Sequence, residues 1–133
     1  MSIIEHKALI QRLYEEAFNR GDMAIVDEIF SPDFRDNSTP SQAPGVEGVK
    51  SYIIAVREGF PDIHVTIEDM IAEADKIAVR TLWRGTHLGT YEGIDPTGKH
   101  VIRTMIQLFS IVDGKIAQEW VEGIGLEQSL TVQ

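Results

Sequence analysis

The sequence has no cysteine, no clustered basic residues and no long apolar run. Without cysteine, disulfides, thiolate nucleophiles and cysteine metal sites are excluded. Lys and Arg number 12 against 21 Asp and Glu, and the net charge of −9 disfavours binding to nucleic acid or to an anionic membrane. No apolar run approaches the roughly 20 residues that span a bilayer, and the N-terminus lacks the apolar core of a signal peptide. We therefore expect a soluble, cytoplasmic protein.

Motifs for the common cofactor and metal chemistries are also missing. The sequence contains no nucleophile elbow, no H-E-x-x-H motif, no EF-hand loop and no glycine-rich phosphate loop. Its histidines lie far apart and show no ligand spacing; they are His6, His64, His87 and His100. We therefore expect neither a metal nor a cofactor.

The first half of the chain has helical periodicity. Apolar residues recur at three- and four-residue spacing over residues 4–18, 22–30 and 46–60. Gly21 suits a left-handed cap after the first segment, and Pro61 ends the third. The spacing predicts three helices, with a short extended piece at residues 34–37 and a surface loop at 38–45.

The second half has the period of two that is typical of strands. Alternation predicts strands over residues 63–68, 76–87, 101–112 and 116–121, and a short helix over 125–130. Asp113-Gly114 suits a tight type I′ hairpin turn. Helices followed by a strand meander predict one α+β domain over residues 1–133, a curved antiparallel sheet wrapped around the N-terminal helices. A sheet bent in this way encloses a cone-shaped apolar pocket that fits a small molecule.

The predicted strand at 101–112 carries apolar residues on both faces. One face, with Val101, Met105 and Phe109, suits the core, and the other presents Ile102, Ile106 and Leu108. The second face is too apolar to stand in water. We therefore expect a homodimer that forms through this outer face of the sheet.

Several sequence blocks, in this order and spacing, carry a resemblance to a known family. They are Y-E-E-A-F-N-R-G-D at 14–22, S-P-D-F at 31–34, G-T-H at 85–87, G-I-D-P-T-G at 93–98, and V-D-G-K-I at 112–116 ahead of Trp120. The chain resembles the SnoaL-like polyketide cyclase (ester cyclase) family of the nuclear transport factor 2-like superfamily. The resemblance implies a cystatin-like half-barrel and a small, apolar, carbonyl-type ligand. Because relatives of this fold include isomerases, hydrolases, dehydratases and ligand-binding domains, it does not imply one reaction.

At the cyclase acid/base positions this sequence departs from the family pattern. The family's cyclases are thought to use an aspartate on the last strand and a histidine on the strand before it. Alignment through V-D-G-K-I without a gap puts Val121 at the aspartate position and Gln107 at the histidine position. Valine cannot transfer a proton and glutamine hardly can.

Four residues are candidates for catalysis: Glu119, Glu122, His87 and Arg103. Glu119 and Glu122 flank the lost aspartate, and alternation points Glu119 the same way as Val121; the alternative for both is a solvated strand edge. His87 could act as an acid or base, or be a buried structural histidine. Arg103 could bind a carboxylate or enolate, or form a structural ion pair.

The predicted pocket wall is mainly aromatic and aliphatic. It consists of Tyr14, Phe34, Trp83, Met105, Gln107, Phe109, Trp120 and Val121; Asp36 is a weaker candidate. Two functions remain open at this point. One is a cofactor-independent cyclase, isomerase or hydrolase that works by proton transfer, and the other is a non-catalytic ligand-binding or interaction domain. A carboxylate or histidine that reaches the cavity would favour the enzyme.

Overall fold

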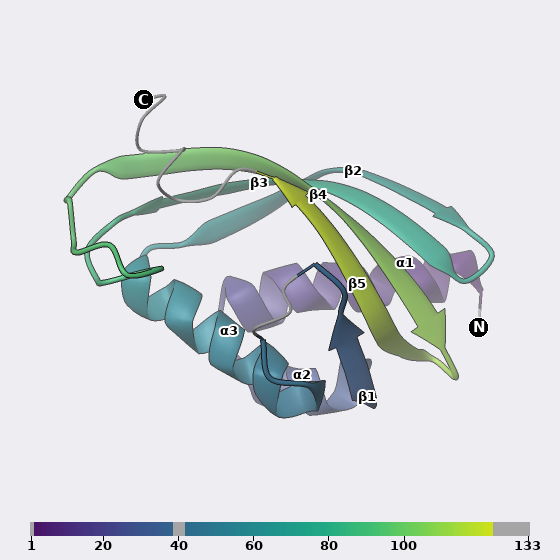
Figure 1. Ribbon diagram of the computed structural model, residues 1–133. Helices are drawn as coiled ribbons and strands as arrows, with labels where there is room; N and C mark the ends of the chain where they lie inside the picture. Colours follow the sequence, from purple (N-terminus) through teal and green to yellow (C-terminus); the bar gives the residue numbers. More distant parts are fainter. Residues whose placement is uncertain (1, 39–41, 124–133) are drawn as a thin grey trace.

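A computed structural model describes residues 2–38 and 42–123, in which helices lie along the concave side of a curved five-stranded sheet (Figure 1). The helical elements are α1 (Ile3–Arg12), the π-helical segment η1 (Leu13–Phe18), α2 (Ala24–Ile29) and α3 (Gly45–Gly59). The strands are β1 (Phe30–Asp36), β2 (His64–Glu73), β3 (Lys76–Thr86), β4 (His100–Val112) and β5 (Lys115–Gly123). The α+β fold class and the curved sheet around the helices are confirmed. The predicted helix at 125–130 lies outside the described residues.

The sheet has the strand order β1-β5-β4-β3-β2 and is mixed. β2, β3, β4 and β5 form the predicted antiparallel meander, whereas β1 pairs with β5 in parallel. The sequence predicts only an isolated extended piece here, because Phe30 and Phe34 are the buried positions of β1 and give little alternation. This parallel pairing places the end of β1 beside the middle of β5.

The first predicted helix changes its hydrogen-bond pattern after Arg12. α1 begins with a capping box between Ser2 and Glu5, and η1 ends where the Asn19 N–H donates to the Tyr14 carbonyl five residues earlier, at 2.9 Å. The wider turn brings the rings of Tyr14 and Phe18 into a stack, with centroids 5.7 Å apart. Both rings are buried on the side that faces the sheet.

Most strand boundaries follow the predicted alternation. Asp113 and Gly114 have φ values of 50° and 74°, as a type I′ turn requires. β2 continues to Glu73, five residues beyond the predicted end, because a bulge between Ile67 and Asp69 shifts the alternation that the sequence pattern relies on.

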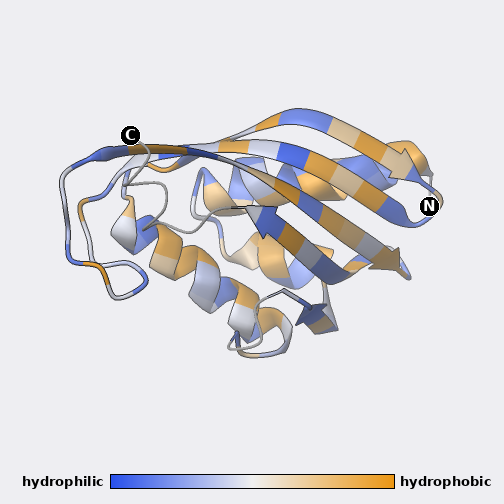
Figure 2. Cartoon of the chain, turned by 45° about the horizontal axis from the view of Figure 1, so that its top comes forward, coloured by the Kyte–Doolittle hydropathy of each residue, from blue (hydrophilic) through white to orange (hydrophobic). Residues whose placement is uncertain are grey.

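The two faces of the sheet have different surroundings, as the stripes of hydropathy along the strands indicate (Figure 2). The concave face packs on the helices, and its buried residues include Ile77, Val79, Phe109 and Ile116. The convex face, called the outer face below, leaves apolar side chains exposed: Ile71, Ile102, Ile106, Leu108 and Val112. None of the described helices, of which α3 with 15 residues is the longest, is long and apolar enough to cross a membrane.

Candidate functional site

A cavity of about 560 Å³ lies between the concave face of the sheet and the helices. Side chains from η1, β1, α3, β3, β4 and β5 and from the loop after β3 contribute to its wall. Besides Glu119, seven further residues that the sequence analysis placed at the site line it: Tyr14, Phe34, Trp83, Arg103, Met105, Gln107 and Val121. A space of this size fits a small organic molecule.

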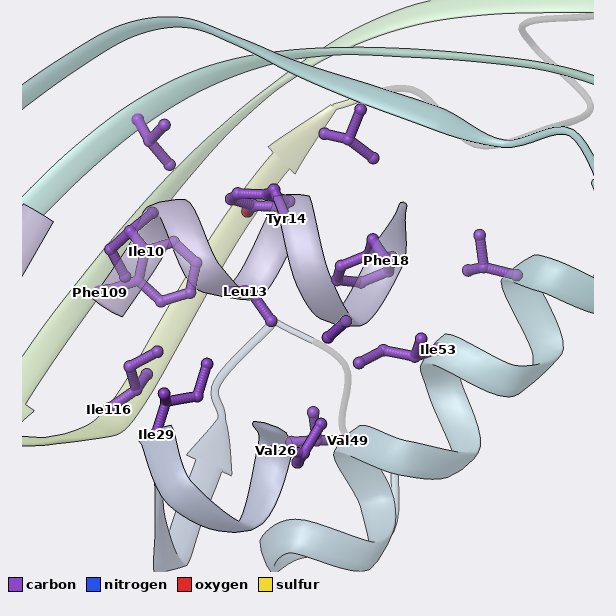
Figure 3. Close-up of a cluster of buried hydrophobic side chains, with 14 of the residues drawn as sticks. Ile10, Leu13, Tyr14, Phe18, Val26, Ile29, Val49, Ile53, Phe109 and Ile116 are labelled. Carbon is purple, nitrogen blue, oxygen red and sulfur yellow. The ribbon is translucent and has the colours of Figure 1, made fainter. Parts of the chain in front are cut away.

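Aromatic rings form much of the apolar wall. Trp83 meets Phe18 edge to face at 4.9 Å between ring centroids, and it meets Tyr14 in the same way at 5.9 Å. Figure 3 shows Phe18 and Ile53 at one end of the buried cluster in this view, and Phe109 with Ile10 and Ile116 at the other. Because these rings interlock, they give the cavity a defined shape.

Two carboxylates from neighbouring strands share the cavity. Asp36 on β1 and Glu119 on β5 are cross-strand partners, and both line the wall. The strands are held together at this point by the Asn37 N–H, which donates to the Glu119 carbonyl at 2.9 Å, and by the Val121 N–H, which donates to Ser38 Oγ at 2.8 Å. The backbone therefore fixes the two acids side by side.

The setting of Glu119 favours its protonated form. Burial against the apolar wall, and secondarily the nearby negative charge of Asp36, raise the pKa of Glu119 to about 8. Its side chain is half-buried, and it lines the cavity itself. A carboxyl with a pKa near neutrality can serve as an acid or a base at ordinary pH. Glu119 also raises the pKa of the Tyr14 hydroxyl, which burial already places well above its ordinary value.

A buried hydrogen-bond chain runs along the sheet from Trp83 to Gln107. The Trp83 indole N–H donates to Thr81 Oγ1 at 2.7 Å, and the Thr81 hydroxyl donates to Gln107 Oε1 at 3.0 Å. Thr81 and Gln107 are both buried. The chain holds the Gln107 amide in one orientation in the cavity wall.

A second polar group contains Arg103 and two tyrosines. Tyr52, Tyr91 and Arg103 all line the cavity, and their side chains are close enough to influence one another electrostatically. Burial raises the pKa of both tyrosines, although the positive charge of Arg103 opposes this effect. Both hydroxyls therefore stay neutral near pH 7 and keep their hydrogen atoms for hydrogen bonds.

The remaining sequence candidates lie elsewhere. Glu122 is exposed opposite Ile106 on the outer face, and Trp120, opposite Leu108 on that face, has Lys76 above its ring at 5.3 Å. Phe109 is fully buried in the core. For Glu122 the structure matches the solvated alternative.

His87 is fully buried behind the cavity wall. Its ring stacks on Phe60, and its Nδ1 lies 3.0 Å from Thr97 Oγ1 and accepts the Thr97 N–H at 3.3 Å. Among the described residues, none is hydrogen-bonded to its Nε2. These contacts match the structural alternative, in which His87 anchors the loop that carries Thr90, Tyr91 and Glu92 to the cavity.

Sequence reasoning gave too little weight to Asp36 and missed Thr81, Tyr52 and Tyr91. A signal for Asp36 was its acidic side chain two residues after Phe34, but its partner Glu119 is distant in sequence and no local pattern connects them. Over residues 2–38 and 42–123, no group of three or more His, Asp or Glu side chains is placed to hold a metal ion.

Comparison with known proteins gives a family and several solved structures of the same fold. The model of a family described as SnoaL-like polyketide cyclase matches residues 8–124. TsrD from Streptomyces laurentii is 27% identical, with a TM-score of 0.91 over 100% of this chain and 99% of that one. None of the curated proteins matches the chain.

Two further solved structures differ from each other in the activity suggested for them. AclR from Streptomyces galilaeus, described as a proposed hydroxylase, is 28% identical, with a TM-score of 0.83 over 98% of this chain and 81% of that one. IdmH from Streptomyces antibioticus, described as a proposed polyketide cyclase, is also 28% identical, with a TM-score of 0.79 over 96% of both chains. The shared fold is therefore compatible with more than one chemistry.

Proposed function

The chain belongs to the SnoaL-like polyketide cyclase family, and we propose that it binds a small, largely apolar carbonyl compound and transfers a proton at the carbon next to the carbonyl, without a cofactor. The observation that carries this proposal is the Glu119 carboxyl, which lies in the cavity wall beside Asp36 with a pKa of about 8. Isomerisation and ring closure of carbonyl compounds both begin with such a proton transfer.

The position of Glu119 supports its assignment as the proton-transfer group. Val121, which stands at the family's aspartate position, and Glu119 both line the cavity from the same face of β5. A carboxyl two residues along a strand keeps the same orientation and moves by roughly 6.5–7 Å. We therefore propose that Glu119 replaces the missing aspartate and that the substrate lies closer to β1 than it would for an acid at position 121.

Proton exchange into a simple ketone tests this proposal directly. 2-Acetylnaphthalene has an apolar ring system and exchangeable hydrogens next to its carbonyl, so NMR in D₂O reports their exchange for deuterium. Glu119→Gln should lower the protein-catalysed exchange rate by roughly 10²–10⁴-fold, the usual contribution of a placed acid/base group, and should keep the fold and the affinity for the ketone. Glu122→Gln is the matched control, because Glu122 lies on the same strand but on the outer face.

The pH dependence of exchange gives a second readout. A base acts in its deprotonated form, so the exchange rate should rise with pH and level off above the Glu119 pKa of about 8. If wild-type protein binds the ketone but Glu119→Gln leaves exchange unchanged, proton transfer by Glu119 is wrong. The non-catalytic ligand-binding domain would then be the better description.

A further inference from the structure

The Gln107 amide is a polar group of the cavity wall that has no role in the proton transfer as proposed so far. Gln107 is only 1% exposed, yet it contributes to the cavity wall between the apolar side chains of Met105 and Val121. We infer that the Gln107 Nε2–H₂ group donates a hydrogen bond to the carbonyl oxygen of the substrate and to the enolate oxygen formed from it. The inference rests on the proposed function, because it assigns the group that receives the charge when Glu119 removes a proton.

The direction of the amide follows from the chain of hydrogen bonds behind it. An indole N–H is a donor only, so Thr81 Oγ1 must accept from Trp83. The single hydroxyl hydrogen of Thr81 then goes to Gln107 Oε1 at 3.0 Å rather than to the Met105 carbonyl, which lies at 3.5 Å, the outer limit for a hydrogen bond. With its oxygen engaged in this way, Gln107 directs its NH₂ group away from Thr81.

Within residues 2–38 and 42–123, no side chain or carbonyl accepts a hydrogen bond from the NH₂ group of Gln107. The hydrogen bond of the Gln107 side chain runs through its Oε1 to Thr81, and Gln107 lines the cavity, so its Nε2 is available to a molecule bound there. A carbonyl oxygen accepts such hydrogen bonds, and an enolate oxygen accepts them more strongly because it carries negative charge. The chemistry of the wall therefore selects ligands with an exposed oxygen acceptor.

Gln107 and Glu119 are arranged to act on adjacent atoms of one ligand. Gln107 pairs with Val121, and Glu119 lies two residues before Val121 on β5. Such diagonal neighbours on one face of a sheet have Cα atoms roughly 7–8 Å apart. A carbonyl group fits between them with its oxygen toward Gln107 and its α-carbon toward Glu119.

In this arrangement the proton transfer needs no reactant other than the ligand and Glu119. The Glu119 carboxylate takes a proton from the α-carbon, the C–H electron pair forms the new C=C bond, and the C=O π electrons move to the oxygen. Gln107 donates to the resulting enolate oxygen, and Glu119 returns the proton to carbon. Donors fixed in advance at the developing charge lower the barrier, because they need no reorganisation during the reaction.

A matched pair of ligands tests whether the donor is present. 2-Acetylnaphthalene and 2-isopropenylnaphthalene have nearly the same shape, but the second has a CH₂ group in place of the carbonyl oxygen. Wild-type protein should bind the ketone roughly tenfold more tightly than the alkene, the ratio that one hydrogen bond to a buried donor provides. Gln107→Met removes the donor and should bring the two affinities within about twofold of each other.

Thr81 provides a second test with a conservative control, because it acts through Gln107. Thr81→Val removes the hydroxyl that orients the amide and should lower the preference for the ketone, while Thr81→Ser keeps the hydroxyl and should retain that preference. If Gln107→Met does not fold, as judged by circular dichroism, the Thr81 pair still decides the outcome.

Infrared spectroscopy of the ¹³C-labelled carbonyl reports the hydrogen bond itself. The stretching frequency of the bound ketone should lie below its value in an apolar solvent for wild type and Thr81→Ser, and should return toward that value for Gln107→Met. An unchanged frequency in Gln107→Met, an equal affinity of wild type for ketone and alkene, or binding of neither compound would overturn the inference.

The outcomes separate this inference from the proposed function. Loss of the ketone preference in Gln107→Met, together with exchange that Glu119→Gln does not alter, would keep the carbonyl donor and reject proton transfer by Glu119. The reverse pair of results would reject the donor and keep the proton transfer.

Discussion

The concave and outer faces of the sheet invert the usual distribution of side chains. On the concave face, polar residues stand among buried apolar ones, with Glu119, Gln107 and Arg103 in the cavity wall and Thr81 beneath them. On the outer face, apolar residues are left in contact with solvent, among them Ile106, which is 55% exposed. Both arrangements cost stability in an isolated domain.

Each face of the sheet has side chains that suit a different kind of binding partner. Buried polar groups that face a cavity indicate a ligand with matching chemistry, because the cavity gives them access to one. Exposed apolar groups that gather on the outer face of a sheet are typical of a surface that contacts another macromolecule. The same four antiparallel strands therefore present two different surfaces, one on each face, because side chains alternate between the faces along each strand.

Substitutions on the concave face should lower the stability of the fold much more than substitutions on the outer face. Phe109 on the concave side of β4 is fully buried, whereas Ile106 on the same strand faces outward. Phe109→Ala should lower the free energy of unfolding by roughly 3–5 kcal/mol, because it leaves a cavity in the core. Ile106→Ala, the matched control, should cost about 1 kcal/mol or less. Urea unfolding measures both, and equal losses would contradict the assignment of the faces.

On the concave face, ionisation of Glu119 should make the free energy of unfolding depend on pH. Glu119 has a pKa of about 8 in the folded protein against an ordinary value of 4.5. Between these values the folded state binds more protons than the unfolded state, so stability decreases as pH rises and the loss is complete above about pH 8. We expect the contribution to be roughly 2–4 kcal/mol, with allowance for solvent in the cavity.

Glu119→Gln is the control for this dependence, because the amide has nearly the same shape and does not ionise. Thermal unfolding from pH 5 to pH 9 should show a decline for wild type and a flatter profile for the variant. Parallel profiles would mean that the Glu119 carboxylate is solvated in the folded protein and that its pKa is close to the ordinary value.

The smallest effect concerns the outer face, where we propose that two copies of the chain meet sheet to sheet. The exposed residues of β4, Ile102, Ile106 and Leu108, form the centre of this surface. Because a two-fold axis brings equivalent residues close together, Ile106→Lys would place two positive charges in an apolar contact. It should raise the dimer dissociation constant roughly 100-fold, or about 2.7 kcal/mol.

Sedimentation velocity at micromolar concentration measures this change. Ile54→Lys serves as the control, because Ile54 is an exposed apolar residue of α3 and does not belong to the outer face of the sheet. A monomeric wild-type protein at these concentrations would exclude the dimer, and dissociation by both variants alike would place the contact elsewhere.

Much of the fold could be predicted from local patterns. The alternation of Val101, Ile102, Met105 and Ile106 assigned the two faces of β4 correctly, because side chains in a strand alternate with a period of two. Asp113-Gly114 predicted its turn from the requirement for positive φ at both residues. The π-helical segment at Leu13–Phe18 could not be predicted, since the shift in hydrogen bonding leaves the apolar spacing nearly unchanged.

The candidate site was predictable only in part. Alternation with Val121 placed Glu119 on the cavity side, and the same argument holds for Met105 and Gln107. Trp120 and Phe109 were also assigned to the pocket wall, but the structure places the first on the outer face and the second in the core. Size and apolarity do not distinguish a pocket wall from the core, because both are lined by the same residue types.

Local spacing was enough to predict the three helical regions, the antiparallel meander, the two faces of β4 and the family, because each depends on residues that are near one another in the chain. Which polar groups lie together depends instead on contacts between strands that are distant in the sequence. Asp36 meets Glu119 through the parallel pairing of β1 with β5, and Thr81 orients Gln107 across β3 and β4. The pKa of Glu119 depends on that meeting and on the apolar wall around it, since burial and a neighbouring charge act through space and not along the chain.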